Sequence, residues 1–164
     1  MKNSKKIKHI HCFDCDGVLL DSSHRYRTVE TKKGKRIDLA HWRENEKFAS
    51  EDKPLKISEL YRKLVTQKNT FVIIATSRIL KPLDLSHIDI VLGLSDAIVS
   101  RSTDNQKGFL LKINGIQRIV DDFNLHHVDL KNNLTIYEDN IEYLKNMCDF
   151  FDCKGIYIPS NQGH

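Results

Sequence analysis

The chain has 164 residues, of which 40% are hydrophobic and 29% are charged. These proportions are typical of one globular domain, expected over residues 1–164, and they exclude a disordered or collagen-like chain. No apolar run approaches the roughly 18 residues that cross a bilayer, so we expect no membrane partner. The net charge of +4 comes from lysines in the first eight residues. Those residues do not form a signal peptide, which predicts a cytoplasmic protein.

The first half of the chain predicts one strand, a polar insertion and two helices. Ile7 to Phe13 is an apolar run, as expected of a buried strand. Residues 23–36 are polar and basic and are expected to form a loop. Leu39 to Ala49 indicates a short helix that carries the only tryptophan. A second helix is predicted to open at Asp52-Lys53-Pro54, because the apolar residues that follow recur at helical spacing.

The second half alternates short apolar runs with longer amphipathic segments. Thr70 to Ala75 is almost entirely apolar, which suits a strand buried on both faces of a parallel sheet. Asn105 to Phe123 places its apolar residues on one helical face, and Asp104 is a candidate N-cap. The other predicted elements are strands at 96–100, 134–137 and 155–158 and a helix at 141–151. The alternation predicts an α/β fold with a mainly parallel sheet flanked by helices.

Four cysteines raise the question of a metal site. Cys12 and Cys15 have a spacing found in zinc sites, but they flank a predicted buried strand, whose alternate side chains point to opposite faces. Cys148 and Cys153 have a looser spacing. We interpret all four as reduced thiols, with zinc binding as the lesser alternative.

Reactive side chains follow three of the predicted strands. The carboxyl ends of parallel strands form the ligand crevice of an open sheet, so these groups are expected to converge. The first strand is followed by Asp14-Cys15-Asp16-Gly17, which puts two carboxylates in one tight loop. One carboxylate can attack phosphorus and the other can move protons. The alternative is an ordinary turn, since Asp and Gly are common in turns.

Two further segments bring charge to the same edge. Thr76-Ser77-Arg78 offers hydroxyls and a guanidinium fork, which suit phosphate oxygens. Glu138-Asp139-Asn140 adds acids, and carboxylates gathered at one edge would repel unless a hard divalent cation lay between them. Lys107 lies at the start of a predicted helix, and by itself a solvated charge is the simpler interpretation.

Together these segments resemble the four motifs of the haloacid dehalogenase (HAD) superfamily. The matching segments, in the order of the family, are Phe13 to Ser22, Ile73 to Thr76, Lys107 and Glu138-Asp139. They extend over nearly the whole chain. The resemblance implies a Rossmann-like HAD fold, and the short insert at 22–52 leaves room for at most a small cap.

Within the superfamily, the chain is similar to the 3′-phosphatase half of phage polynucleotide kinase/phosphatases. Asp16 resembles the phosphatase branch, and Thr76-Ser77-Arg78 stands where that group has Ser-Gly-Arg. Arg25 and Asp104 match two more of its positions. No P-loop sequence is present, so a kinase half is not expected.

The resemblance implies a Mg²⁺-dependent phosphatase that acts through an aspartyl phosphate. Asp14 is the implied nucleophile, Asp16 the implied acid and base, and both would hold the metal with Asp139. The residues implied to bind phosphate or substrate are Thr76, Ser77, Arg78, Lys107, Arg25 and Asp104. A solvated loop charge is the alternative for Arg25. Glu138 and Asn140 differ from the Asp and Arg of that group, and are implied to support the residues that touch metal and substrate.

The expected substrate depends on the insert. A small cap leaves a site open to a polymer end, and residues 23–36 carry seven basic side chains against one acid. With Tyr26 among them, this stretch can track a nucleic-acid backbone, and a solvated loop is the alternative. We therefore expect action on nucleic-acid 3′-phosphate ends or nucleotides. The alternatives are a phosphatase for mononucleotides or other small phosphoesters, and a non-catalytic binding module on a HAD scaffold.

Overall fold

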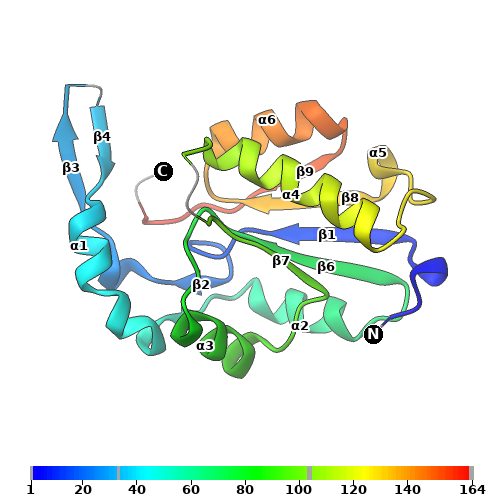
Figure 1. Cartoon of the computed structure of the whole chain (residues 1–164), viewed down its shortest axis with the longest axis horizontal. Coiled ribbons are helices and arrows are strands. Elements are labelled where there is room, and N and C mark those ends of the chain that lie inside the picture. Colours follow the sequence, from blue (N-terminus) through cyan, green and yellow to red (C-terminus); the bar gives the residue numbers. More distant parts are fainter. Residues whose placement is uncertain (1, 33, 103–104, 163–164) are drawn as a thin grey trace.

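A five-stranded parallel sheet forms the centre of the computed structural model, which describes residues 2–32, 34–102 and 105–162 (Figure 1). In spatial order its strands are β7 (Ala97–Val99), β6 (Thr70–Ala75), β1 (His9–Phe13), β8 (Leu134–Glu138) and β9 (Lys154–Tyr157). Every neighbouring pair is parallel. β6 is buried at all six positions, which explains its continuous apolar sequence. The predicted α/β fold with a mainly parallel sheet is confirmed.

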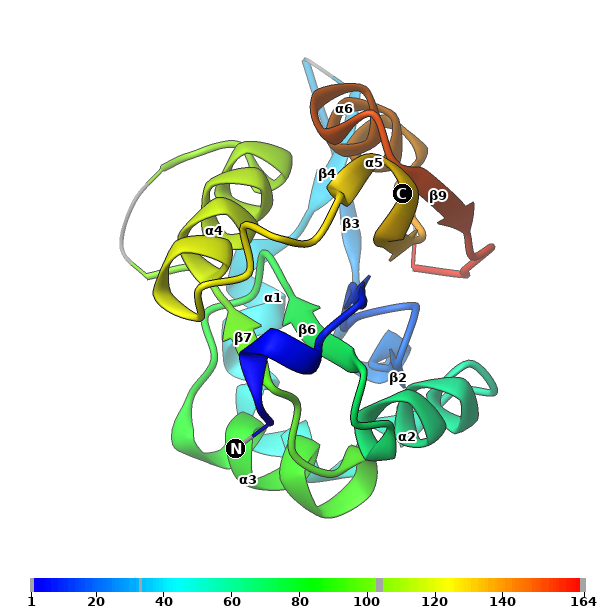
Figure 2. The ribbon, with the colours of Figure 1, turned by 90° about the vertical axis from the view of Figure 1, so that its right-hand side faces the viewer.

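Helices cover both faces of this sheet (Figures 1 and 2). On one face lie α4 (Gly108–Asp122) and α6 (Ile141–Phe151), and on the other lie α2 (Ser58–Thr66) and α3 (Pro82–Leu92). The short helices α5 (Leu130–Asn133) and η1 (Ser4–Lys6) precede β8 and β1. Among the described residues, no helix combines the length and the apolar character needed to cross a membrane.

Alternating side chains of β1 and the loop after it divide the apolar residues between two cores. Ile10 and Cys12 belong to the core under α4 and α6, whereas Phe13 and Cys15 belong to the core over α2 and α3. Both thiols are buried, and burial raises their pKa values. Because Cys12 and Cys15 lie in different cores, they do not form a shared zinc site.

Residues 22–52, which we call the cap, lie beyond the carboxyl ends of the strands (Figure 1). The cap contains η2 (Ser23–Arg25), the hairpin of β3 (Thr28–Thr31) and β4 (Gly34–Ile37), α1 (Leu39–Glu44) and η3 (Glu46–Glu51). At its base, β2 (Leu20–Asp21) pairs with β5 (Lys53–Pro54) in an antiparallel sheet. Asp38 joins the hairpin to α1, because it accepts hydrogen bonds from the Arg27 guanidinium and from the His41 N–H.

Several local predictions differ from the structure. The helix expected to open at Asp52 begins at Ser58, because Lys53 and Pro54 pair with β2. The helix expected over 39–49 ends at Glu44, and a 3₁₀ helix follows it. The hairpin of β3 and β4 replaces much of the loop that was expected over 23–36, and the helix α3 was not predicted. α3 is apolar on most of its sides, so its sequence lacks the periodicity of an amphipathic helix.

Candidate active site at the carboxyl edge of the sheet

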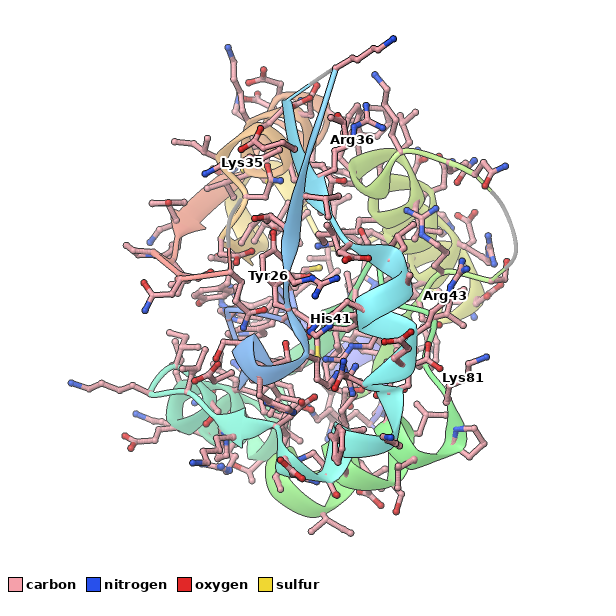
Figure 3. The ribbon with its side chains drawn as sticks, turned by 90° about the vertical axis from the view of Figure 1, so that its left-hand side faces the viewer. Tyr26, Lys35, Arg36, His41, Arg43 and Lys81 are labelled. Atoms are coloured by element: carbon pink, nitrogen blue, oxygen red, sulfur yellow. The ribbon has the colours of Figure 1, made fainter. Side chains whose placement is uncertain are left out.

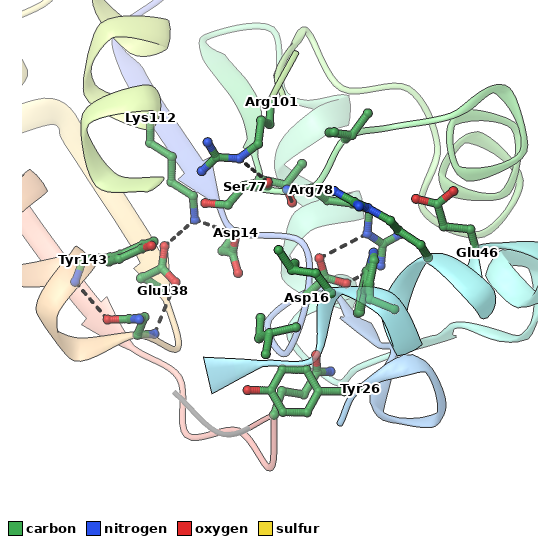
Figure 4. Close-up of a pocket in the computed structure, with 18 of the residues that line it drawn as sticks. Asp14, Asp16, Tyr26, Glu46, Ser77, Arg78, Arg101, Lys112, Glu138 and Tyr143 are labelled. Atoms are coloured by element: carbon green, nitrogen blue, oxygen red, sulfur yellow. Dashed lines mark hydrogen bonds and ion pairs between the residues drawn. The ribbon is translucent and has the colours of Figure 1, made fainter. Parts of the chain in front are cut away.

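A cavity of about 480 Å³ opens between the cap and the carboxyl edge of the sheet (Figure 4). Asp14, Asp16, Lys112 and Glu138 line it from the core. The cap contributes Tyr26, Ile37, Leu39, Trp42, Arg43 and Glu46. Reactive groups from β1, α4 and β8 therefore meet in one place, as expected at the end of a parallel sheet.

Asp14 and Asp16 lie in the loop that follows β1. The Asp14 N–H donates to the Tyr137 carbonyl at 2.9 Å, so the strand pairing holds this residue at the sheet edge. Gly17 has a φ of 77°, and a Cβ there would overlap Asp139 Oδ2 and Ser160 Oγ. The tight turn of this loop thus requires a glycine.

Lys112, from α4, is the cation beside Asp14. Its Nζ donates to Asp14 Oδ1 and to Glu138 Oε2, each at 2.6 Å, and its side chain is 2% exposed. Burial alone would lower the pKa of Lys112, but the two carboxylates outweigh it and raise the pKa. Lys107, which we predicted for this place, lies exposed before α4 and outside the cavity lining. Its Nζ is 5.8 Å from the centre of the Phe109 ring.

The sequence contains a signal for Lys112 that the motif comparison missed. Lys112 recurs at helical spacing with Ile116 and Ile119, on the buried face of α4. A lysine on a buried face is rare unless it is paired. Its position in the helical pattern therefore indicates a buried partner, whereas Lys107 lies outside the helix.

Three buried carboxylates gather beside Lys112. Asp14, Glu138 and Asp139 each offer an oxygen, and these oxygens lie within 4.8 Å of one another. Burial and the neighbouring Glu138 raise the pKa of Asp14 to about 7, and burial and Asp14 raise the pKa of Asp139 to about 6. One lysine compensates only part of this negative charge. A hard cation with oxygen ligands would relieve the rest, so the donor set fits Mg²⁺.

Asp16 has different surroundings from Asp14. The Arg78 guanidinium donates to both Asp16 oxygens, with Nε at 3.2 Å from Oδ2, and Ser22 Oγ donates to Oδ1 at 2.6 Å. Burial alone would raise the pKa of Asp16, but Arg78 and Ser22 outweigh it and hold the pKa below its usual value. The two carboxyls of one loop thus have pKa values displaced in opposite directions.

Arg78 and Arg25, which we expected to grip a phosphate or substrate, have carboxylate partners. In addition to Asp16, Arg78 binds Asp84 at 2.9 Å and Asp52 at 3.1 Å. Arg25 is 0% exposed, and its Nη1 lies 3.1 Å from the same Asp84 oxygen. The alternative of a solvated loop charge for Arg25 is therefore wrong.

Trp42 of the cap packs on this ion network. Its ring lies 4.4 Å from the Arg25 guanidinium carbon and 5.1 Å from that of Arg78. Cations over an aromatic face are attracted to it. The stack connects α1 of the cap with Arg78 of the core, and through Arg78 with Asp16.

Thr76 and Ser77 line the cavity after β6. In the described part of the chain, the buried Ser77 Oγ has no hydrogen-bond partner, so a ligand oxygen would satisfy it. The Asn140 N–H donates to Glu138 Oε1 at 3.2 Å, and both residues line the cavity. Asp104, another predicted substrate residue, lies outside the described residues.

No protein-family model matches the sequence, and a search of curated proteins gives no match. The structure, in contrast, is similar to solved HAD proteins. A haloacid dehalogenase-like hydrolase from Streptococcus pneumoniae superposes with a TM-score of 0.64 at 12% identity, covering 96% of this chain and 89% of that one. A HAD-superfamily hydrolase of subfamily IA from Geobacter sulfurreducens has a TM-score of 0.60 at 8% identity, covering 93% and 87%.

A third similar structure is 3-deoxy-D-manno-octulosonate 8-phosphate phosphatase from Moraxella catarrhalis, in complex with a magnesium ion, a phosphate ion and KDO. Its TM-score is 0.50 at 14% identity, covering 98% of this chain and 73% of that one. These identities are low, so the likeness concerns the fold. The chain therefore has the fold of the haloacid dehalogenase superfamily, as its motifs predicted.

Proposed function

We propose that the protein is a Mg²⁺-dependent phosphomonoester hydrolase that acts through an aspartyl phosphate. The observation that carries this proposal is the pair Asp14 and Asp16, two carboxyls of one loop that line the cavity, with Lys112 Nζ 2.6 Å from Asp14 Oδ1 and the Asp139 carboxylate beside Asp14. One carboxylate of such a pair can attack phosphorus, and the other can give a proton to the leaving oxygen. The fold supports the proposal, because a similar structure is a phosphatase in complex with magnesium and phosphate ions.

In the proposed reaction, an Asp14 oxygen attacks phosphorus while the bond from phosphorus to the leaving oxygen breaks. Asp16 gives that oxygen a proton, and later takes a proton from the water that hydrolyses the aspartyl phosphate. A phosphate dianion next to Asp16 raises its pKa, because like charges disfavour the ionised form. The incoming substrate thus helps Asp16 to carry the proton that it must donate.

The phosphate oxygens are assigned to Lys112, Thr76 and Ser77. Lys112 takes the place that we first gave to Lys107, because its Nζ is 2.6 Å from Asp14. Bound by Asp14, Asp139 and the Asp16 carbonyl, Mg²⁺ would offset the repulsion between the attacking carboxylate and the phosphate.

We propose phosphorylated nucleic-acid ends, and 3′-phosphates in particular, as substrates. Lys35, Arg36 and Arg43 are exposed on the cap, and Lys81 is exposed beside it (Figure 3). Lys35 lies 3.9 Å from Glu30, but both side chains are more than 70% exposed, so this pair is weak. A positive surface next to the cavity attracts a polyanionic backbone.

The four free cysteines fit the reducing cytoplasm that the sequence predicted.

A second candidate is a free mononucleotide. The cavity has the size of a small-molecule site, and the rings of Tyr26, Trp42 and Tyr143 line it. Aromatic rings stack on bases whether or not the base belongs to a polymer.

A substrate panel with Mg²⁺ tests the activity and separates the two candidates. It compares 3′-phosphorylated and 5′-phosphorylated oligonucleotides, mononucleotides and an aryl phosphate. We expect the 3′-phosphorylated oligonucleotide to have the highest kcat/KM, and this value to fall steeply with salt. Equal kcat/KM for nucleotide and polymer would favour the second candidate. No phosphate release from any compound would leave a non-catalytic module, and full activity in Asp14→Asn would exclude an aspartyl phosphate on Asp14.

Two charge variants test the surface of the cap. Arg36→Gln is expected to lower kcat/KM for the oligonucleotide and to leave the aryl phosphate unaffected. Lys63→Gln removes one exposed charge from α2, outside the cap, and is the matched control. If both variants have the same effect, the cap surface does not bind the polymer.

A further inference from the structure

Residues 158–162, which we call the strap, follow β9 and lie against the loop that contains Asp14 and Asp16. The Ile158 N–H donates to the Glu138 carbonyl at 2.9 Å, which continues the pairing of β9 with β8. The next residues leave the sheet edge. Gln162 is only 3% exposed and lines the cavity. None of the motifs in the sequence includes these residues.

Ser160 holds the carboxylate of Asp139. Its Oγ donates to Asp139 Oδ2 at 2.6 Å, and it accepts from the Gln162 N–H at 3.1 Å. A hydroxyl has one proton, so the N–H of Gln162 directs that proton toward Asp139. The packing is close, because a Cβ at Gly17 would overlap both oxygens.

Gln162 holds Asp16 through Ser22. Ser22 Oγ gives its one proton to Asp16 Oδ1 at 2.6 Å, so it can only accept from Gln162. The amide therefore turns its nitrogen to Ser22 Oγ and its oxygen to the N–H groups of Gly17 and Ser22, each at 3.1 Å. In this orientation the amide nitrogen donates to a hydroxyl oxygen and the amide oxygen accepts from two N–H groups.

We propose that Ser160 and Gln162 are positioning residues of the active site. Ser160 orients the Asp139 carboxylate for the metal, and Gln162 orients Asp16, through Ser22, for proton transfer to the leaving group. The inference rests on the proposed function for the role of Asp16, and on the acidic cluster alone for the role of Asp139. The strap, which is far from the motifs in sequence, thereby positions both a metal ligand and the proton donor.

Mg²⁺ binding tests Ser160. Calorimetric titration with Mg²⁺ is compared for the wild type, Ser160→Ala and Asn161→Ala, the last being an exposed neighbour and the matched control. Residues that orient a metal ligand change metal affinity by about 10–100-fold when removed, and we expect a loss of this size in Ser160→Ala alone. Thermal unfolding without Mg²⁺ checks that each variant folds. Wild-type affinity in folded Ser160→Ala would overturn this half of the proposal.

The leaving group tests Gln162. The kcat/KM for a phosphatase of this type reports the steps up to the aspartyl phosphate, and an alkyl leaving group needs a proton there more than an aryl one does. We expect Gln162→Ala to lower kcat/KM about tenfold or more for an alkyl phosphate and less than about twofold for an aryl phosphate. A merely structural role would lower both equally, and that result would overturn the assignment.

The two sets of results separate this inference from the proposed function. If the wild type hydrolyses no phosphoester, the proposed function fails, and the Mg²⁺ titration still decides the role of Ser160. If the wild type is active and both strap variants behave like Asn161→Ala, the strap assignment alone fails. Should Ser160→Ala not fold, Gln162→Ala carries the test by itself.

Discussion

Replacing Lys112 with methionine removes the only cation that touches Asp14 among the described residues, while keeping a side chain of similar length. Lys112 Nζ is bonded to two buried carboxylates at 2.6 Å. Removing one partner of a buried ion pair typically costs about 3–5 kcal/mol, because the other charge is left uncompensated. We expect a loss of this size in the free energy of unfolding at pH 8.

The loss is expected to shrink as the pH falls. The pKa of Asp14 is already raised to about 7 by burial and by Glu138, and it rises further without Lys112. A carboxyl with a raised folded pKa stabilises the protein below its unfolded pKa, and this contribution is lost as the pH rises through the folded value. Wild-type Asp14 takes up the same proton near pH 7, so the loss shrinks by about 1.4 kcal/mol per pH unit only between the pKa of Asp14 in the variant and pH 7.

Urea unfolding of the wild type and Lys112→Met, at pH 5 and pH 8 with a chelator present, measures these differences. Lys107→Met is the matched control, because Lys107 is an exposed lysine at the start of the same helix. Phosphate release from both variants then shows which lysine serves the reaction. Equal stability of Lys112→Met and the wild type at pH 8, or a loss that does not depend on pH, would refute the reasoning.

Three further substitutions test the packing and the charges around the site. Arg78→Met is expected to lower the free energy of unfolding by about 3 kcal/mol, measured in urea, because it leaves Asp16 and its neighbours uncompensated. Burial lowers the pKa of His11 to about 4, so wild-type stability falls as the pH drops from 6.5 to 4. In His11→Gln, the free energy of unfolding is expected to fall less between pH 6.5 and pH 4. The difference from the wild type is about 1–2 kcal/mol after allowance for solvent screening. Gly115→Ala is expected to cost about 1–3 kcal/mol in thermal unfolding, because its Cβ would overlap the Val99 side chain.

Each of these expectations has an outcome that contradicts it. If Arg78→Met is as stable as the wild type, Asp16 binds another partner or takes up a proton without a loss in the free energy of unfolding. If the free energy of unfolding of His11→Gln depends on pH between 4 and 6.5 as that of the wild type does, other groups cause the loss of stability in acid. If Gly115→Ala unfolds at the wild-type temperature, α4 does not pack against β7 as closely as the structure places it.

The position of the candidate active site could be predicted from the sequence, because its acids directly follow predicted strands. Asp14 and Asp16 follow an apolar run, and in a parallel sheet such positions meet those of other strands. The helix α3 could not be predicted in this way. Apolar side chains surround much of it, including exposed Ile90, so it has no clear periodicity to read.

Ion pairs between distant segments could not be predicted either. Arg25 looks like one charge in a basic loop, and only the fold brings it to Asp84, a residue 59 positions later. Lys112 was missed for a different reason. The motifs predict a lysine at the start of a helix, whereas the lysine beside Asp14 comes from the second turn of α4. Only its position on the apolar face of that helix indicates that it is buried.

Trp42 gives this protein a built-in optical reporter. It is the only tryptophan in the chain, so all indole fluorescence comes from one place. That place is the wall of the cavity, stacked on two guanidinium groups that themselves bind acidic side chains. Ligand entry, or any displacement of the cap, changes the polarity and the quenching around this one ring. Binding kinetics can therefore be followed in the unlabelled wild-type chain, without a phosphate assay.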